Sequence, residues 1–79
     1  MYYTYILKCN DGTYYVGCTN DLDRRLYAHN TLKSGAHYTK IRRPVHFVHT
    51  IMCSTYGEAR KIEAEWKRFT RIEKERLFL

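Results

Sequence analysis

Residues 2–19 read YYTYILKCNDGTYYVGCT, which is two runs rich in Tyr, Ile, Val and Thr on either side of an Asn-Asp-Gly turn signal. Aromatic and β-branched residues favour strands, whereas Asn, Asp and Gly favour tight turns. The stretch therefore predicts a β-hairpin with strands at residues 2–9 and 13–19.

The length of the hairpin loop decides which side chains share a face of the sheet. A two-residue loop at Asp11 and Gly12 would place Tyr5 and Tyr15 on opposite faces. A three-residue loop that also includes Asn10, closed by Gly12 in the left-handed conformation, would place both tyrosines on one face. The hairpin residues by themselves leave both registers open.

A helix is expected after the hairpin, at residues 21–32. Asn20 can cap its N-terminus, and the acidic residues in its first turn suit the helix dipole. Arg25 and His29 are four positions apart, so they stack on one face of this helix, beside its inward-facing leucines.

The second half of the chain predicts a loop, a strand and two helices. The basic segment 34–43 is expected to be a loop. Strand 45–53 is apolar at odd and even positions, which is typical of a strand covered on both sides. Capping boxes that begin at Thr55 and Thr70 predict a helix followed by a short last helix. The inward face of the first of these helices is expected to comprise Ala59, Ile62, Trp66 and Phe69.

Glu63 on the penultimate helix has two interpretations. It adjoins Ile62 on the inward stripe, so it could sit at the edge of the core and face a cleft. The commoner arrangement for a helical glutamate is a surface ion pair with a lysine one turn later, here Lys67.

Composition limits the class of protein. The 79 residues are enough for one domain, residues 1–79, and no second core. No apolar run reaches the ~20 residues that cross a bilayer, and no signal-peptide pattern is present, so a soluble cytoplasmic protein is expected. The three cysteines lack the number and spacing of a disulfide framework or a zinc site.

Charge points to a partner. The formal net charge is +6, and no acidic residue occurs between Arg24 and Gly57. Such one-sided charge predicts a polyanionic partner, nucleic acid rather than membrane, because no basic amphipathic helix with an aromatic insertion face is evident. A merely solubilising basic surface is the alternative.

Two triplets, Tyr3-Thr4-Tyr5 and Tyr15-Val16-Gly17, resemble the paired signature of the GIY-YIG endonuclease superfamily. The agreement continues at similar spacings through further segments: Thr19 to Leu26, His29-Asn30, Gly35 to Thr39, Arg42 to Val45, Ala59, Glu63, Lys67 and Lys74-Glu75. The whole chain thus resembles the small single-domain branch of that superfamily, the UPF0213-like proteins. Position 3 carries Tyr where the signature has Gly.

The resemblance implies an α+β layered fold, in which helices flank a three-stranded antiparallel sheet. It also implies metal-dependent cleavage of phosphodiester bonds and the three-residue hairpin loop, with Tyr5 opposite Gly17. Matched position by position, the implied catalytic residues are Tyr5, Tyr15, Arg25, His29 and Glu63. Glu63 would be the metal ligand, with Glu65 as the alternative if the helix is aligned two residues out.

The chemistry suits these residue types. One carboxylate can anchor a single Mg²⁺ or Mn²⁺, because Mg²⁺ keeps several waters and takes phosphate oxygens as further ligands. Arg25 offers a planar fork of donors for two phosphate oxygens. Tyr5 is expected to be the base that activates water, helped by His29, and Tyr15 to position water or phosphate. The reverse assignment of the two tyrosines remains open.

The expected activity is that of an endonuclease on DNA, with single-stranded or branched DNA as candidate substrates and DNA repair as the kind of process served. The chain has no room for a separate nucleic-acid-binding domain, so its own basic segment is expected to grip the substrate through Lys33, Lys40, Arg42 and Arg43. The alternative is a nucleic-acid-binding module that has little turnover alone or acts when a partner protein presents the substrate.

Overall fold

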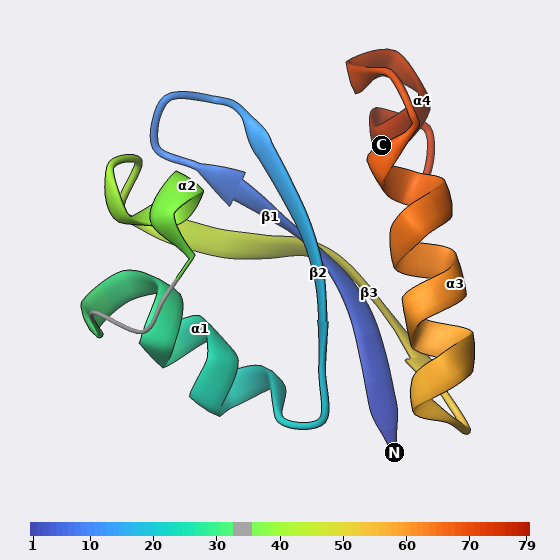
Figure 1. Ribbon diagram of the computed structural model, residues 1–79. Helices are drawn as coiled ribbons and strands as arrows, with labels where there is room; N and C mark the ends of the chain where they lie inside the picture. The colour runs from blue at the N-terminus through green and yellow to red at the C-terminus, as the bar shows by residue number, and fades with distance from the viewer. Residues whose placement is uncertain (33–35) are drawn as a thin grey trace.

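The computed structural model describes residues 1–32 and 36–79. The elements follow in the order β1 (Tyr2–Cys9), β2 (Tyr14–Thr19), α1 (Leu22–Thr31), α2 (His37–Lys40), β3 (Val45–Cys53), α3 (Tyr56–Lys67) and α4 (Arg71–Glu75). The three strands form one antiparallel sheet in the order β2-β1-β3. Helices α1 and α2 lie on one face and α3 and α4 on the other, so the predicted α+β layered fold is confirmed (Figure 1).

The hairpin has the three-residue loop. The amide of Cys9 donates to the carbonyl oxygen of Thr13 at 2.8 Å, and Gly12 bridges the turn with a φ of 85°. Only glycine adopts this left-handed conformation without steric cost. In the resulting register Tyr5 pairs with Gly17, as the family resemblance requires.

Helix α1 is capped by Asp21 and not by Asn20, so that expectation was wrong by one residue. The Asp21 carboxylate accepts the amide of Arg24 at 3.1 Å, and the backbone of Asp21 is extended. The expected caps at Thr55 and Thr70 are confirmed. Of these two caps, Thr70 forms the complete reciprocal capping box, with Glu73, whereas Thr55 accepts the amide of Glu58 without the reciprocal bond.

Successive side chains of the central strand β1 pack alternately into two separate hydrophobic cores. On the α1 face, Tyr5 and Leu7 of β1 are buried with Val45. On the α3 face, Ile6 is buried with Val16 and Trp66. Because β1 is covered on both sides and lies between two strands, it fixes the positions of the tyrosine signature.

Strand β3 departs from the expectation that it is covered on both faces, because His46, Thr50 and Met52 are exposed. Apolar residues occur at both odd and even positions of β3 because the strand contains a β-bulge. Leu7 pairs with Phe47 whereas Ile6 pairs with His49, so Val48 is an extra residue. After the bulge the inward-facing odd positions change from the α1 face to the α3 face.

The basic segment after α1 was expected to be a loop, but part of it is the four-residue helix α2. This helix packs beside α1 and brings the buried side chain of Thr39 against it. In the described part of the chain, no helix has the length and apolar content that a membrane crossing requires.

Candidate functional site

A cluster of buried polar groups lies between β1 and α1. The Tyr5 side chain is 1% exposed, and its hydroxyl lies 2.9 Å from Nε2 of His29, which is also fully buried. Arg25, one turn before His29 on α1, donates from Nε to the same hydroxyl at 3.3 Å. The i, i+4 spacing of Arg25 and His29 therefore places both on the Tyr5 hydroxyl, as predicted for two residues on one helix face.

Tyr15 completes this cluster from the edge strand. Its ring lies edge-on to the His29 ring, with centroids 5.3 Å apart, and close to the ring of Tyr38 at 5.9 Å. Burial alone would lower the pKa of Arg25, but the hydrogen bonds and partial charges of Tyr5 and Tyr15 raise it above its ordinary value. Arg25 is therefore shared by the two tyrosines.

Burial keeps Tyr5 and His29 neutral at physiological pH. Desolvation raises the pKa of Tyr5 to about 12, although the hydrogen bond and charge of Arg25 oppose this shift. Desolvation, together with the charges of Arg25 and Arg43, lowers the pKa of His29 to about 4. The phenol thus holds its proton, and the imidazole has an unshared pair available to accept it.

Gly17 is required by the position of Tyr5. A Cβ atom at residue 17 would collide with the Tyr5 hydroxyl and lie 2.6 Å from its Cζ atom. Glycine therefore lets the hydroxyl end of the Tyr5 ring lie directly against the backbone of the edge strand. This contact explains why the last position of the second signature triplet needs glycine here.

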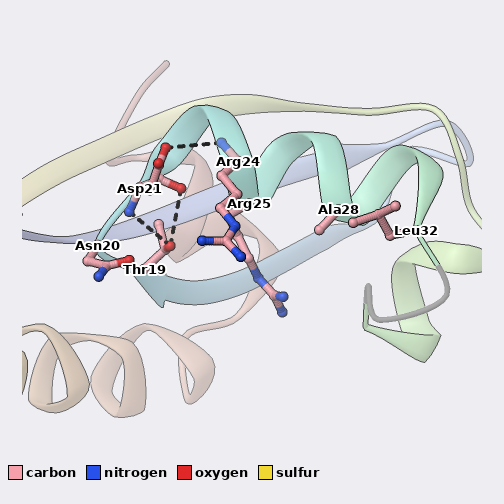
Figure 2. Close-up of a pocket in the computed structure, with 7 residues that line it drawn as sticks. All are labelled: Thr19, Asn20, Asp21, Arg24, Arg25, Ala28 and Leu32. Carbon is pink, nitrogen blue, oxygen red and sulfur yellow. Dashed lines mark hydrogen bonds between the residues drawn. The ribbon is translucent and has the colours of Figure 1, made fainter.

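A hollow of about 260 Å³ opens beside this cluster, between the N-terminus of α1 and the end of β2. It is lined by Thr19, Asn20, Asp21, Arg24, Arg25, Ala28 and Leu32 (Figure 2). Figure 2 shows the side chains of Arg24 and Arg25 on the same side of α1. Because Arg25 contacts the Tyr5 hydroxyl and also lines the hollow, it connects the buried cluster with the surface.

Glu63 lies on the other face of the sheet. Its carboxylate accepts the thiol of Cys18, a β2 residue next to Gly17, with Sγ and Oε1 3.3 Å apart. It also pairs with Lys67 at 3.0 Å and with Arg60 at 3.2 Å. Both interpretations of Glu63 therefore hold in part, because its side chain is only 13% exposed and is paired with Lys67.

The site as a whole straddles the edge strand β2. The structure brings Tyr5, Tyr15, Arg25 and His29 together on the α1 face, and it places Glu63 across the strand from them, beneath Cys18. Burial and the Glu63 carboxylate raise the pKa of Cys18 to about 11, so its thiol stays a donor to Glu63. The other two cysteines, Cys9 and Cys53, are free and buried.

A divalent cation would find oxygen donors at Glu63. No group of three or more metal-ligating side chains occurs among residues 1–32 and 36–79. A lone carboxylate that is partly exposed, as Glu63 is, still fits Mg²⁺, which keeps most of its waters and takes phosphate oxygens. The two cations beside Glu63 are the groups with which such an ion would compete.

The residues expected to grip nucleic acid are largely engaged within the protein. Arg42 pairs with Asp11 at 2.9 Å, and its guanidinium stacks 3.9 Å above the Tyr38 ring. Arg43 donates to three main-chain carbonyl groups at the end of α1. The side chains of Arg42 and Arg43 are therefore held by the protein's own groups and not simply solvated. Lys40 is half-buried, and Lys33 lies outside the described residues.

Sequence reasoning assigned no role to Thr39. This residue is fully buried, and its hydroxyl lies 2.7 Å from Nδ1 of His29, on the side of the ring away from Tyr5. In the sequence, the only indication that Thr39 has a function was its place in segment 35–39, which resembles the family.

Comparison with known proteins supports one family. Residues 1–76 match the GIY-YIG catalytic domain. A UPF0213 protein of Staphylococcus aureus (strain Mu3) is 47% identical over 76 residues, covering 96% of this chain and 92% of the relative.

Two solution NMR structures are also similar. The UPF0213 protein of Bacillus halodurans is 42% identical, with a TM-score of 0.61 over 98% of this chain and 82% of that chain. A protein from E. faecalis is 45% identical, with a TM-score of 0.65, and the match covers 96% of this chain and 80% of that chain. The similarity thus extends over nearly the whole chain in both sequence and fold.

Proposed function

The chain belongs to the GIY-YIG catalytic domain family, and from this premise we propose that it is a metal-dependent endonuclease that hydrolyses DNA phosphodiester bonds. The observation that carries the proposal is the shared hydroxyl of Tyr5, which donates toward His29 and accepts from Arg25. A buried phenol with a proton acceptor on one side and a fixed cation on the other is arranged for proton transfer beside a phosphate.

The proposed proton path runs through Tyr5. An attacking water gives one proton to the Tyr5 oxygen while the phenol proton moves to Nε2 of His29. The hydroxide formed attacks phosphorus, and the bond to the leaving sugar oxygen breaks. That oxygen departs as an alkoxide and takes a proton from solvent water. The resting pKa values of about 12 and about 4 oppose this transfer. Substrate phosphate therefore has a role in it, because its negative charge favours an imidazolium beside it.

Arg25 and Glu63 are assigned the electrostatic roles. Arg25 reaches the hollow from the Tyr5 hydroxyl and would stabilise the charge that develops on the phosphorane oxygens. Glu63 would hold one Mg²⁺ or Mn²⁺, which when bound supplies a Lewis acid for the phosphate oxygens. The DNA backbone would then cross the edge of β2, from the hollow toward α3.

Exposed cations on both sides of that path suit a polyanion. Arg24 is exposed beside the hollow, and on α3 the side chains of Arg60 and Lys67 are 60% and 52% exposed. With Arg42 and Arg43 engaged elsewhere, these residues are the better candidates for phosphate contacts. The substrate proposed is single-stranded or branched DNA, whose backbone deforms more readily than that of a duplex and can follow this path across the edge of β2.

A binding module without autonomous turnover is the second candidate. One observation favours it: in the protein alone, the Glu63 carboxylate is already paired with two cations and the Tyr5 proton is firmly held. A partner that presents the substrate could supply what the isolated domain lacks.

The test uses labelled single-stranded, duplex and flapped DNA with Mg²⁺ or Mn²⁺, and then with EDTA. The wild-type protein is expected to cleave at least one substrate only when metal is present. Glu63→Gln should bind this substrate and leave it intact, whereas Glu65→Gln, a change of the same charge at an exposed site on the same helix, should cleave normally. Binding without cleavage by the wild type would establish the second candidate, and cleavage by Glu63→Gln would remove Glu63 as the metal ligand.

The roles of the two tyrosines are tested by removing each hydroxyl. Tyr5→Phe is expected to slow cleavage by ~10²–10⁴-fold, the usual contribution of a general base. Tyr5 is almost completely buried whereas Tyr15 is half-buried, so water reaches Tyr15 more easily. A near-normal rate for Tyr5→Phe together with a large loss for Tyr15→Phe would therefore reverse the assignment.

A further inference from the structure

His29 has a hydrogen-bond partner on each ring nitrogen. Nε2 lies 2.9 Å from the Tyr5 hydroxyl, and Nδ1 lies 2.7 Å from the Thr39 hydroxyl. The Thr39 hydroxyl in turn lies 2.9 Å from the carbonyl oxygen of Ala36. Tyr5, His29 and Thr39 are all at most 1% exposed, so these partners are not exchanged for water.

The direction of each hydrogen bond follows from counting protons. A carbonyl oxygen only accepts, so the single proton of the Thr39 hydroxyl is donated to Ala36. Thr39 can then only accept from His29, which places the ring proton on Nδ1. A neutral imidazole with its proton on Nδ1 has a bare Nε2, which accepts the proton of Tyr5.

The opposite tautomer fails the same count. With the proton on Nε2, the Tyr5 oxygen would receive donors from both His29 and Arg25, and its own proton would lose its acceptor in His29. If Thr39 then donated to Nδ1, its oxygen would face the Ala36 carbonyl at 2.9 Å without a proton between them. The Ala36 carbonyl oxygen keeps the amides of Thr39 and Lys40 as donors, so the cost there is the repulsion of two facing oxygen atoms. The buried Tyr5 proton without an acceptor costs about 1–3 kcal/mol.

We propose that Thr39 is a positioning residue that fixes His29 as the Nδ1–H tautomer and thereby turns a bare Nε2 toward the Tyr5 proton. Its role in cleavage rests on the nuclease function proposed above, whereas the tautomer itself does not. The histidine is held in place on its main chain as well, because Arg43 donates from Nε to the His29 carbonyl oxygen at 2.6 Å. Helix α2 thus contributes to the site by carrying one hydroxyl.

The tautomer is tested directly by NMR of protein labelled with ¹⁵N in histidine, because protonated and bare ring nitrogens differ widely in ¹⁵N chemical shift. Wild-type His29 is expected to carry its proton on Nδ1 near neutral pH. Thr39→Val, which keeps the shape but removes the hydroxyl, should shift His29 toward the Nε2–H form, and Thr39→Ser should restore Nδ1–H. Thr50→Val, at an exposed site on β3, should change nothing.

A wild-type His29 with its proton on Nε2 would overturn the proposal, and so would an unchanged tautomer in a folded Thr39→Val variant. If Thr39→Val does not fold, the same measurement on Thr39→Ala decides. The smaller residue leaves room for the chain to fold, and it should also shift the proton away from Nδ1.

Cleavage assays then separate this proposal from the nuclease function. If the wild type cleaves, Thr39→Val should have a kcat roughly 10–100-fold lower with little change in KM, which is the usual effect of losing a partner that orients a functional histidine. Thr39→Ser should recover most of the lost kcat. A shifted tautomer with an unchanged rate would refute the catalytic role of Thr39 and leave the nuclease proposal standing. If no cleavage occurs at all, the nuclease proposal fails, and the NMR result still decides the tautomer.

Discussion

Arg43 donates from Nε to the carbonyl oxygen of His29 at 2.6 Å. Its Nη2 atom also donates to the carbonyl oxygens of Leu32 at 2.7 Å and Ala28 at 3.4 Å. The last carbonyl groups of a helix lack amide donors within the helix, so they need other partners. The Ala28 carbonyl oxygen also accepts the amide of Leu32. A basic residue that sequence analysis assigns to nucleic acid therefore stabilises the helix that carries Arg25 and His29.

Arg43→Gln is expected to lower the free energy of unfolding by about 1–3 kcal/mol, because carbonyl groups at the end of α1 lose a charged donor. Urea denaturation followed by circular dichroism measures this change. Arg68→Gln is the control, since Arg68 is exposed, and it should change stability by less than ~0.5 kcal/mol. Equal stability of the two variants would show that Arg43 contributes nothing to α1.

Gly17→Ala is expected to destabilise the protein by about 1–3 kcal/mol and to abolish the Tyr5–His29 hydrogen bond, because the added Cβ overlaps the Tyr5 ring. Thermal denaturation and the NMR signals of the two rings report these effects. Gly57→Ala is the matched control, because only Thr55 approaches its Cβ, at 3.9 Å, and alanine favours the helix. A stable Gly17→Ala variant with an intact Tyr5 contact would contradict the close packing at β2.

His29 predicts a loss of stability in mild acid. Its pKa is lowered to about 4 in the folded protein, whereas the unfolded chain takes up the proton near pH 6.5. Stability should therefore fall as pH decreases from about 6.5 to about 4, since the unfolded state binds the additional proton. Urea midpoints across this range measure the loss. The slope should be smaller in His29→Gln and unchanged in His37→Gln, whose side chain is exposed.

Lys67→Gln is expected to bind Mn²⁺ roughly two- to fivefold more tightly, because it removes one of the two cations that pair with Glu63. Water relaxation measured during a Mn²⁺ titration at low salt reports the affinity. Lys61→Gln has the same change in net charge at an exposed position of α3. If both variants tighten binding equally, the effect is one of overall charge and the Mn²⁺ ion does not bind at Glu63.

The sequence predicted the parts of the fold that depend on neighbouring residues. The hairpin residues predicted the two strands and left two registers open, and the family resemblance favoured the three-residue loop closed by Gly12 that the structure has. The i, i+4 spacing of Arg25 and His29 was enough to place both on one face. The cap of α1 was placed one residue early, because Asn20 and Asp21 are both good caps and only the backbone geometry distinguishes them.

Other features depend on contacts between distant segments. Nothing in the local pattern showed that Thr39 and Arg43 would turn inward to α1, since a basic segment with few apolar residues is normally solvated. The position of Glu63 across β2 from the tyrosines depends on which face of the sheet α3 covers. The family resemblance predicted that these residues act together, but only the packing shows that a strand lies between them.

The extra residue in β3 also means that this strand could lose one residue without exchanging the contents of its two layers. Phe47 and His49, on either side of Val48, already pair with consecutive residues of β1. Deletion of Val48 would therefore restore simple alternation, and the side chains of His49 and Ile51 would stay on the face that they share with Trp66. We expect natural variation in the length of this strand to be concentrated at Val48, because the loss of a residue there preserves the pairing on both sides of it.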